Sequence, residues 1–354
     1  MLANERLKHW LKLSVAIGGS VFFTALFVGS IDVREVGRAL AGADYAYVAP
    51  ALVLFAVSLV FRGVRWSLLF QPQPRLSWAR LMPSLLVGYA GNNLLPLRAG
   101  ELLRAQHLST RESVPRMHTF GTLMMERLFD GLVLATFVLW GILLVDVSAA
   151  YLGVGLALAG ATAAGFVVCI VLANRPDLVE RVTRLPIPFV SSRVREAVAG
   201  LGESFLNGFS VLRSPSRFGL VSLASMAAWG FELGMYWLLS QAFDLHASFI
   251  TIAAAGAAAN VALSLPSAQG GVGPFQYVAT QALVRFALPA DAAGAYALAL
   301  HIFLVVPVSL VGLVVLWRTA LRRKSEGAVE IASENELRVA PPRVGPDVVD
   351  EVAH

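Results

Sequence analysis

Long stretches without a charged residue decide what this chain can fold into. A bilayer core is crossed by about 20 apolar residues of α-helix, and most of these stretches are long enough to span it. With 57% hydrophobic and 14% charged residues, the chain is also far more apolar than a soluble domain. We therefore predict an all-α, polytopic membrane protein. The uncharged stretches are residues 13–31, 45–61, 81–97, 147–174, 245–284 and 292–317.

The positions of the basic residues predict the topology. Most of the 28 Lys and Arg residues lie in five segments, which the positive-inside rule assigns to the cytoplasm together with both termini. We expect a multi-pass protein of the cell membrane whose basic surface faces anionic lipid headgroups and not nucleic acid. The five segments are 1–12, 62–80, 98–116, 175–217 and 318–354. They leave about six full spans, near residues 13–31, 46–62, 118–145, 149–173, 218–241 and 292–317.

Two similar breaks interrupt the apolar pattern, one in each half of the chain. Each has a Pro, which stops a helix, and a Gly four residues later, which lets the chain turn. The flanking charges require each segment to enter and leave on one side of the membrane. We predict two re-entrant helical hairpins from opposite faces, over 78–113 and 248–288. Their tips are formed by Asn93, Pro96 and Gly100 in the first hairpin and by Asn260, Pro266, Gly270, Gly271, Gly273 and Gln276 in the second.

The two hairpins together predict an inverted repeat. Paired broken helices in the two halves of a membrane protein indicate a transporter's binding site near the midplane. Counting the hairpins as spans gives about eight helical segments, but residues 99–113 are too polar to cross the lipid.

Two further segments lie outside the predicted spans. Apolar residues recur at helical spacing over 194–212, so we predict that the cytoplasmic segment 174–217 carries an amphipathic helix on the membrane surface. The tail 318–354 is polar and contains three prolines after residue 340, which predicts disorder. The transmembrane domain is then residues 1–317.

Ionisable residues inside the apolar helices are the candidate site. Charges at such depth are costly, face the bundle interior and usually have a function. Arginine forks match phosphate oxygens, so we predict that these residues bind a lipid headgroup. They are Arg62 and Arg65 in the second span, Arg98, Glu101 and Arg104 after the first break, Glu126, Arg127 and Asp130 in the third span, and Glu232 in the fifth.

Structural interpretations of the same residues stay open. Arg62 and Arg65 also suit interfacial anchors, because arginine snorkels to the membrane surface. Glu126, Arg127 and Asp130 also suit an ion-pair cluster that holds helices together. Glu232 has no basic neighbour in sequence, so its partner is expected among Arg98, Arg104 and Arg127.

Other kinds of site have no support in the sequence. The single cysteine, Cys169, lies in an apolar stretch, and the six histidines form no cluster with metal-ligand spacing. No P-loop, Gly-x-Ser-x-Gly or HExxH motif occurs. We expect no metal, no cofactor and no catalytic residue, and thus a protein that is not an enzyme.

The ordered motifs resemble the lysylphosphatidylglycerol synthase transmembrane-region family of flippase-like membrane proteins. They are Arg62-x-x-Arg65-Trp66, Asn93-x-x-Pro96-x-Arg98-x-Gly100-Glu101-x-x-Arg104, Glu126-Arg127-x-x-Asp130, Glu232 and Leu265-Pro266-x-x-x-Gly270-Gly271-x-Gly273. The resemblance implies a helical domain that moves polar lipids between leaflets. It covers about residues 10–320 and includes no soluble aminoacyltransferase domain. Gln276 stands where family members often carry an acidic residue, which suggests a difference in substrate or coupling.

We predict a lipid translocator that moves a phospholipid or polyprenyl-linked lipid between leaflets. One alternative is a membrane-embedded transferase acting on a lipid headgroup. Another is a non-transporting partner that anchors an envelope-synthesis enzyme through residues 174–217. Association into a homo-oligomer is compatible with each of them.

Overall fold

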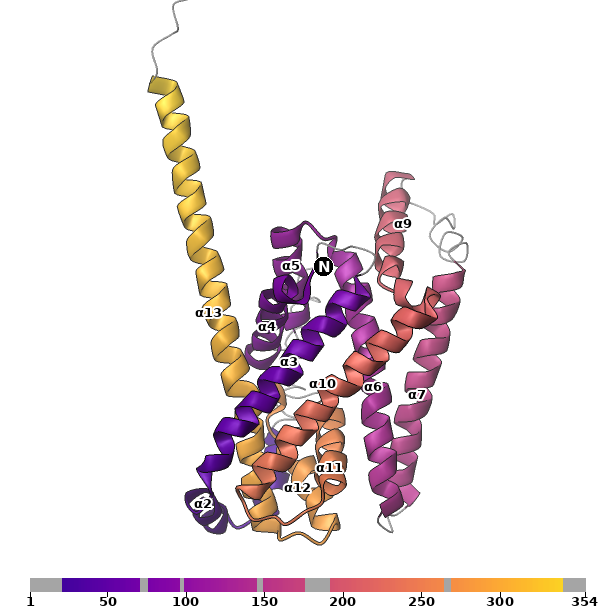
Figure 1. Ribbon diagram of the computed structural model, residues 1–354, viewed down its shortest axis with the longest axis vertical. Coiled ribbons are helices and arrows are strands. Elements are labelled where there is room, and N and C mark those ends of the chain that lie inside the picture. Colours follow the sequence, from indigo (N-terminus) through magenta and orange to yellow (C-terminus); the bar gives the residue numbers. More distant parts are fainter. Residues whose placement is uncertain are drawn as a thin grey trace, which may run out of the picture. The chain divides into compact units, whose positions relative to one another are not determined.

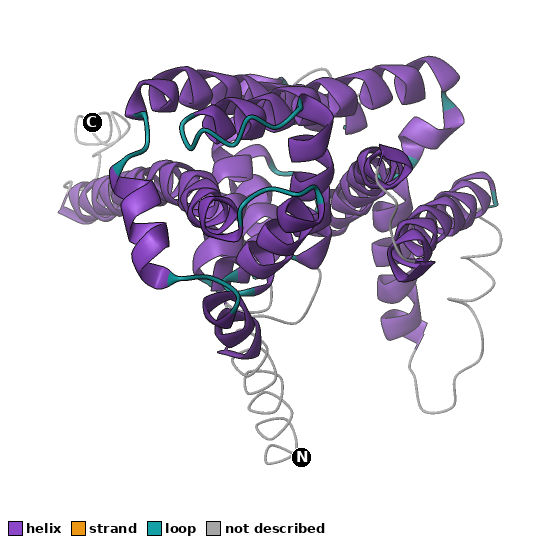
Figure 2. Ribbon diagram, turned by 90° about the horizontal axis from the view of Figure 1, so that it is seen from below, coloured by secondary structure: helices purple, strands orange, loops and turns teal. Residues whose placement is uncertain are grey.

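The computed structural model confirms an all-α protein. It describes residues 21–70, 76–95, 99–144, 149–175, 192–263 and 269–339. Within these ranges the regular elements are α-helices and short 3-10 helices, with no strand (Figures 1 and 2). The chain divides into two compact units, Met1–Gly312 and Leu313–His354. The packing that forms the candidate site lies within the first unit.

Long apolar helices follow the predicted spans. Four helical stretches among the described residues are long and apolar enough to cross a membrane: Tyr45–Leu69, Gly155–Asn174, Pro215–Gln241 and Ala290–Leu321. The helix α6 is also long enough to cross a membrane at 29 residues, but it contains more charged residues than any of these four stretches. The long helices are α3 (Val48–Leu69), α6 (Arg116–Leu144), α7 (Ala149–Asn174), α10 (Pro215–Gln241) and α13 (Ala290–Val339).

The first predicted span and the loop after it are described in part. Residues 21–29 are helical, and residues 1–20 lie outside the described ranges. The helix α2 (Val33–Ala41) and the 3-10 helix η1 (Tyr45–Tyr47) then lead into α3. Asp32 caps α2, and its own N–H donates to Asp291 Oδ1 at 2.8 Å, which fixes this loop to the start of α13.

Both breaks form helical hairpins. The first pairs α4 (Trp78–Leu94) with α5 (Gly100–Glu112), and the second pairs α11 (Phe249–Ala262) with α12 (Pro274–Arg285). Figure 1 shows them at opposite ends of the bundle. Their 17, 13, 14 and 12 residues give lengths of about 18–26 Å. A bilayer core is about 30 Å thick, so these lengths favour the re-entrant topology. The exact number of spans stays a prediction.

The tips of the two hairpins meet beside α13. Asn93, near the end of α4, donates from Nδ2 to the Val305 carbonyl at 3.4 Å and to Ser309 Oγ at 3.1 Å. A Cβ built on Gly270 of the other tip would lie 3.3 Å from the Asn93 carbonyl oxygen. Residues 96–98 and 264–268, which include Pro96, Arg98 and Pro266, lie outside the described residues.

The second tip needs its glycines and is braced by side chains. Gly270, Gly271 and Gly273 have φ of 68°, 73° and 96°, a region that side chains rarely tolerate. Gly273 N–H donates to Gln276 Oε1 at 2.9 Å, and Gln276 Nε2 lies 2.6 Å from His301 Nδ1. His301 Nε2 is 2.8 Å from the Gly270 carbonyl oxygen, which can only accept. This His301 tautomer therefore carries its proton on Nε2, and buried Gln276 supports the tip.

The predicted amphipathic helix is α9 (Ser192–Asn207), followed by the 3-10 helix η3 (Ser210–Arg213). It packs against α6, where Gly121 meets the Phe205 carbonyl with no room for a side chain. Val194, Val198 and Leu201 are exposed on α9. Its location on the membrane surface stays a prediction, and residues 176–191 lie outside the described ranges.

The last helix, α13, continues into the tail, for which disorder was predicted from residue 318. α13 extends past residue 318 to Val339, and residues 340–354 lie outside the described ranges. The segment 318–338 is rich in Arg, Leu, Ala and Glu, which are among the strongest helix formers, so it propagates the preceding helix. Disorder of the tail stays a prediction.

The first hairpin depends on a glycine contact that a methyl group would break. A Cβ on Gly100 would collide with the Gly88 carbonyl and the Asn92 backbone, so Gly100→Ala should separate the arms and cost about 1–3 kcal/mol. Thermal unfolding of the detergent-purified protein should show a lower Tm. Gly160→Ala is the matched control, because nothing lies within 4 Å of a Cβ there. An equal Tm for the two variants would contradict this packing.

Candidate functional site

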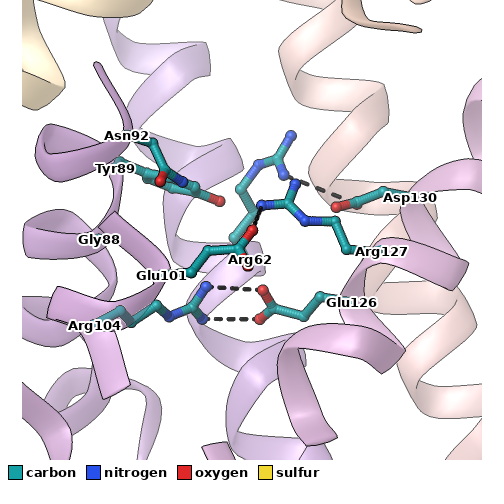
Figure 3. A pocket seen from close by; sticks show the side chains of 9 residues that line it. All are labelled: Arg62, Gly88, Tyr89, Asn92, Glu101, Arg104, Glu126, Arg127 and Asp130. Atoms are coloured by element: carbon teal, nitrogen blue, oxygen red, sulfur yellow. Dashed lines mark hydrogen bonds and ion pairs between the residues drawn. The ribbon is translucent and has the colours of Figure 1, made fainter. Parts of the chain in front are cut away.

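A polar pocket lies between α3, the first hairpin and α6 (Figure 3). Its empty volume, open mouth included, is about 340 Å³. Three arginines and three carboxylates line it, so their formal charges cancel. The lining residues are Arg62 from α3, Gly88, Tyr89 and Asn92 from α4, Glu101 and Arg104 from α5, and Glu126, Arg127 and Asp130 from α6.

Arg104 and Glu126 form a two-pronged ion pair that joins α5 to α6. The two guanidinium nitrogens donate to the two carboxylate oxygens at 2.9 Å each. The Arg104 guanidinium also stacks over the buried Trp66 ring, 3.6 Å from its centroid. Its aliphatic stem lies against Gly88, where a Cβ would be only 2.9 Å away. Gly88 therefore makes the space in which Arg104 reaches Glu126.

Arg65 and Asp130 form a second pair deeper in the bundle. Arg65 Nη1 donates to Asp130 Oδ1 at 2.5 Å, and Trp229 Nε1 donates to the same oxygen at 2.8 Å. Arg65 is only 1% exposed and does not line the pocket. The interpretation of Arg62 and Arg65 as interfacial anchors is wrong, because both side chains point into the bundle and pair with carboxylates there.

Glu232 pairs with Arg62, and the expected partners Arg104 and Arg127 are not used. Arg62 donates to Glu232 Oε2 from Nη2 at 2.6 Å and from Nε at 3.2 Å. The pairing follows from the close packing of α3 against α10, which brings residues 170 positions apart together. Distance along the sequence could not predict this contact.

The Glu232 pair is also connected to the second hairpin. Tyr236 donates from its hydroxyl to Glu232 Oε1 at 3.2 Å, and Asn260 at the end of α11 donates to the Tyr236 oxygen at 3.0 Å. Arg62 Nη1 lies 3.9 Å from Asp130 Oδ1 on its other side. Polar contacts thus run from the second hairpin through α10, α3 and α6 to the first.

Arg127 and Glu101 form the most accessible pair of the site. Arg127 Nη2 donates to Glu101 Oε1 at 2.6 Å, and their side chains are 47% and 29% exposed. It is therefore the least buried of the four ion pairs, and the one that a ligand in the pocket can reach most easily. The other three pairs are almost fully buried, and opening one would leave a charge without a partner in an apolar bundle.

The pocket also contains polar residues that the sequence did not single out. Asn92 and Tyr89 line it from α4, and Asn92 Oδ1 is buried without a hydrogen-bond partner in the described part of the chain. One signal was present, since Asn92 and Asn93 interrupt an otherwise apolar stretch. Neither Asn93 nor the described residues of the second tip line the pocket, and among the described residues no group of His, Cys, Asp and Glu suits a metal ion.

Residues 10–312 match the family described as the lysylphosphatidylglycerol synthase TM region. The chain belongs to this family. It is 30% identical to the Glycosyltransferase AglD of Haloferax volcanii, over 84% of this chain and 54% of that protein. Two UPF0104 membrane proteins of Methanothermobacter thermautotrophicus are 27% and 26% identical, over 75% and 74% of this chain and 83% and 80% of theirs. No solved structure matches.

The lysylphosphatidylglycerol synthase TM family and these relatives indicate a multi-pass membrane protein with a lipid-related role. They also correct one prediction. We expected a protein that is not an enzyme, and the similarity to a protein named a glycosyltransferase contradicts that expectation. This chain spans about half the length of that relative, at 54%. The absent P-loop, Gly-x-Ser-x-Gly and HExxH motifs belong to other enzyme classes, so their absence did not bear on a glycosyltransferase.

The buried ion pairs predict a clear double-mutant result. Arg104→Met leaves the buried Glu126 carboxylate with only Arg65 Nη2 nearby, at 3.9 Å, and should cost about 3–5 kcal/mol. Adding Glu126→Gln removes that charge and should restore most of the lost Tm. Thermal unfolding in detergent measures both.

Substitution in the accessible Arg127–Glu101 pair is the comparison for Arg104→Met. Arg127→Met should lower the Tm less than Arg104→Met does, because the Arg127–Glu101 pair is less buried than the Arg104–Glu126 pair. If Arg127→Met lowers the Tm as much as Arg104→Met, the distinction between buried and accessible pairs is wrong.

Proposed function

We propose that this protein binds the phosphate of a lipid headgroup in the Arg62–Asp130 pocket and moves that headgroup between leaflets. The observation that carries the proposal is the accessible Arg127–Glu101 pair in a pocket of otherwise buried ion pairs. Guanidinium groups bind phosphate oxygens through charge-assisted hydrogen bonds. Arg98 lies outside the described residues, and we propose that it joins this set from the first hairpin.

The hairpins support translocation of the headgroup. Their arms are shorter than a bilayer is thick, and their tips meet beside α13. We propose that both termini are cytoplasmic and that the two hairpins enter from opposite faces of the cell membrane. The lipid tails then stay in the bilayer, and only the headgroup requires a polar path. A phospholipid or a polyprenyl-linked lipid fits this description.

Leaflet exchange in proteoliposomes tests the proposal. The protein should accelerate exchange of an acyl-labelled phospholipid or of a labelled polyprenyl-linked phosphodiester. Arg127→Gln should slow it about tenfold or more, because one charge-assisted hydrogen bond to phosphate is lost. Arg38→Gln is the control, since it removes an equal charge from an exposed pair on α2. Exchange that is equal in empty and protein-containing vesicles, across a broad lipid panel, would contradict translocation.

A lipid headgroup transferase is a second candidate, favoured by the similarity to Glycosyltransferase AglD. Glu126 and Asp130 would then be the candidate bases, although each is now held by an arginine. Lipid mass spectrometry of a strain without the protein separates the candidates. A missing lipid species supports a transferase, whereas an unchanged inventory with an altered leaflet distribution supports a translocator.

A further inference from the structure

The Arg127–Glu101 pair differs from its neighbours in what happens when it opens. If a phosphate takes the Arg127 guanidinium, the Glu101 carboxylate loses its cation. The other arginines of the pocket, Arg62 and Arg104, remain held by Glu232 and Glu126. The freed carboxylate would then lie beside a second anion, and like charges at short distance repel. A headgroup that is only a phosphate therefore binds at a disadvantage.

The acceptor that a donor-bearing headgroup can reach is Glu101. Figure 3 shows Glu101 on the hairpin side of the pocket, with Arg127 reaching toward it from α6. Asn92 on α4 also lines the pocket, but its Oδ1 has almost no accessible surface and lies close to Gly100 in the other arm. The hairpin thus offers an acceptor where α6 offers a donor.

The charge balance of the pocket points in the same direction. Its three arginines and three carboxylates cancel, so each negative charge of a ligand is in excess, and a second one increases the repulsion. A phosphodiester has a single negative charge. Hydroxyl or ammonium groups attached to it can donate to the carboxylate that the phosphate displaces.

We propose that Glu101 determines headgroup specificity by exchanging partners. The phosphate of a lipid phosphodiester takes Arg127, and a hydrogen-bond donor of the same headgroup takes Glu101. The site accordingly selects phosphodiesters that carry donors over phosphodiesters that lack them and over phosphomonoesters. This inference rests on the proposed binding of a lipid phosphate at the pocket and adds the residue that discriminates between headgroups.

Native mass spectrometry of the full-length protein tests the exchange with three lipids of identical acyl chains. Phosphatidylglycerol offers hydroxyl donors, phosphatidylethanolamine offers an ammonium, and phosphatidylmethanol offers no donor. The wild type should bind at least one of the first two about tenfold more tightly than phosphatidylmethanol. The lipid of these two that binds more tightly shows whether the site prefers hydroxyl donors or an ammonium donor.

Substitution of Glu101 should then remove the preference in a specific way. Glu101→Ala releases Arg127, so phosphatidylmethanol should bind more tightly than to the wild type, and the ratio should fall toward one. Glu101→Gln keeps an acceptor without the charge, so phosphatidylmethanol binding should rise while part of the preference remains. Glu112→Ala is the control, because it removes the same charge from the other end of α5 and should leave the ratio unchanged.

The outcomes separate this inference from the function on which it rests. If all three lipids bind equally to the wild type, or if Glu101→Ala and Glu101→Gln leave phosphatidylmethanol binding unchanged, the exchange is wrong while lipid binding stands. If none of the three lipids binds, or if Arg127→Gln weakens none of them, phosphate binding at the pocket fails as well. Should Glu101→Ala not fold, Glu101→Gln alone decides through its phosphatidylmethanol binding.

Discussion

Pairing of charges inside an apolar bundle is the constraint on which the rest of this structure depends. Moving an arginine or a carboxylate out of water costs several kcal/mol, and only a close partner with good hydrogen bonds recovers that cost. Three such pairs are almost fully buried here, and each joins two different helices. The pairs therefore do more than neutralise charge, because each one ties two helices together. The Arg62–Glu232 pair bridges α3 and α10, and the Arg104–Glu126 pair bridges α5 and α6.

Close backbone approach allows these pairs to form. Gly88 leaves room for the Arg104 stem, and Gly100 lets the two arms of the first hairpin touch. The second hairpin uses glycine differently, for three positive φ angles that Gln276 and His301 then hold in place. Through Asn260 and Tyr236 it reaches the same network as the first hairpin. Both hairpins thus contact one set of charges, which is the physical basis on which a headgroup in the pocket would influence them.

Much of the fold follows from the sequence, and the pairing of its charges does not. Apolar stretches and Pro–Gly breaks predicted the helices and both hairpins, because these depend on local propensity and on the cost of polar groups in lipid. The clustering of Glu126, Arg127 and Asp130 with Glu101 and Arg104 was likewise within reach. The partner of Glu232 was not, since Arg62 is distant in sequence and only tertiary packing brings it near. Asn92 and Tyr89 were missed because a polar residue in an apolar stretch has no charge to mark it.

The central claim is that a lipid phosphate occupies the pocket and takes Arg127 from Glu101. The most direct measurement is an experimental structure of the protein in a lipid nanodisc that contains phosphatidylglycerol. The account predicts phosphate density within hydrogen-bond distance of Arg127, with the Arg62–Glu232 and Arg104–Glu126 pairs intact. Headgroups found only along the outer surface of the helices, with Arg127 still bound to Glu101, would contradict it.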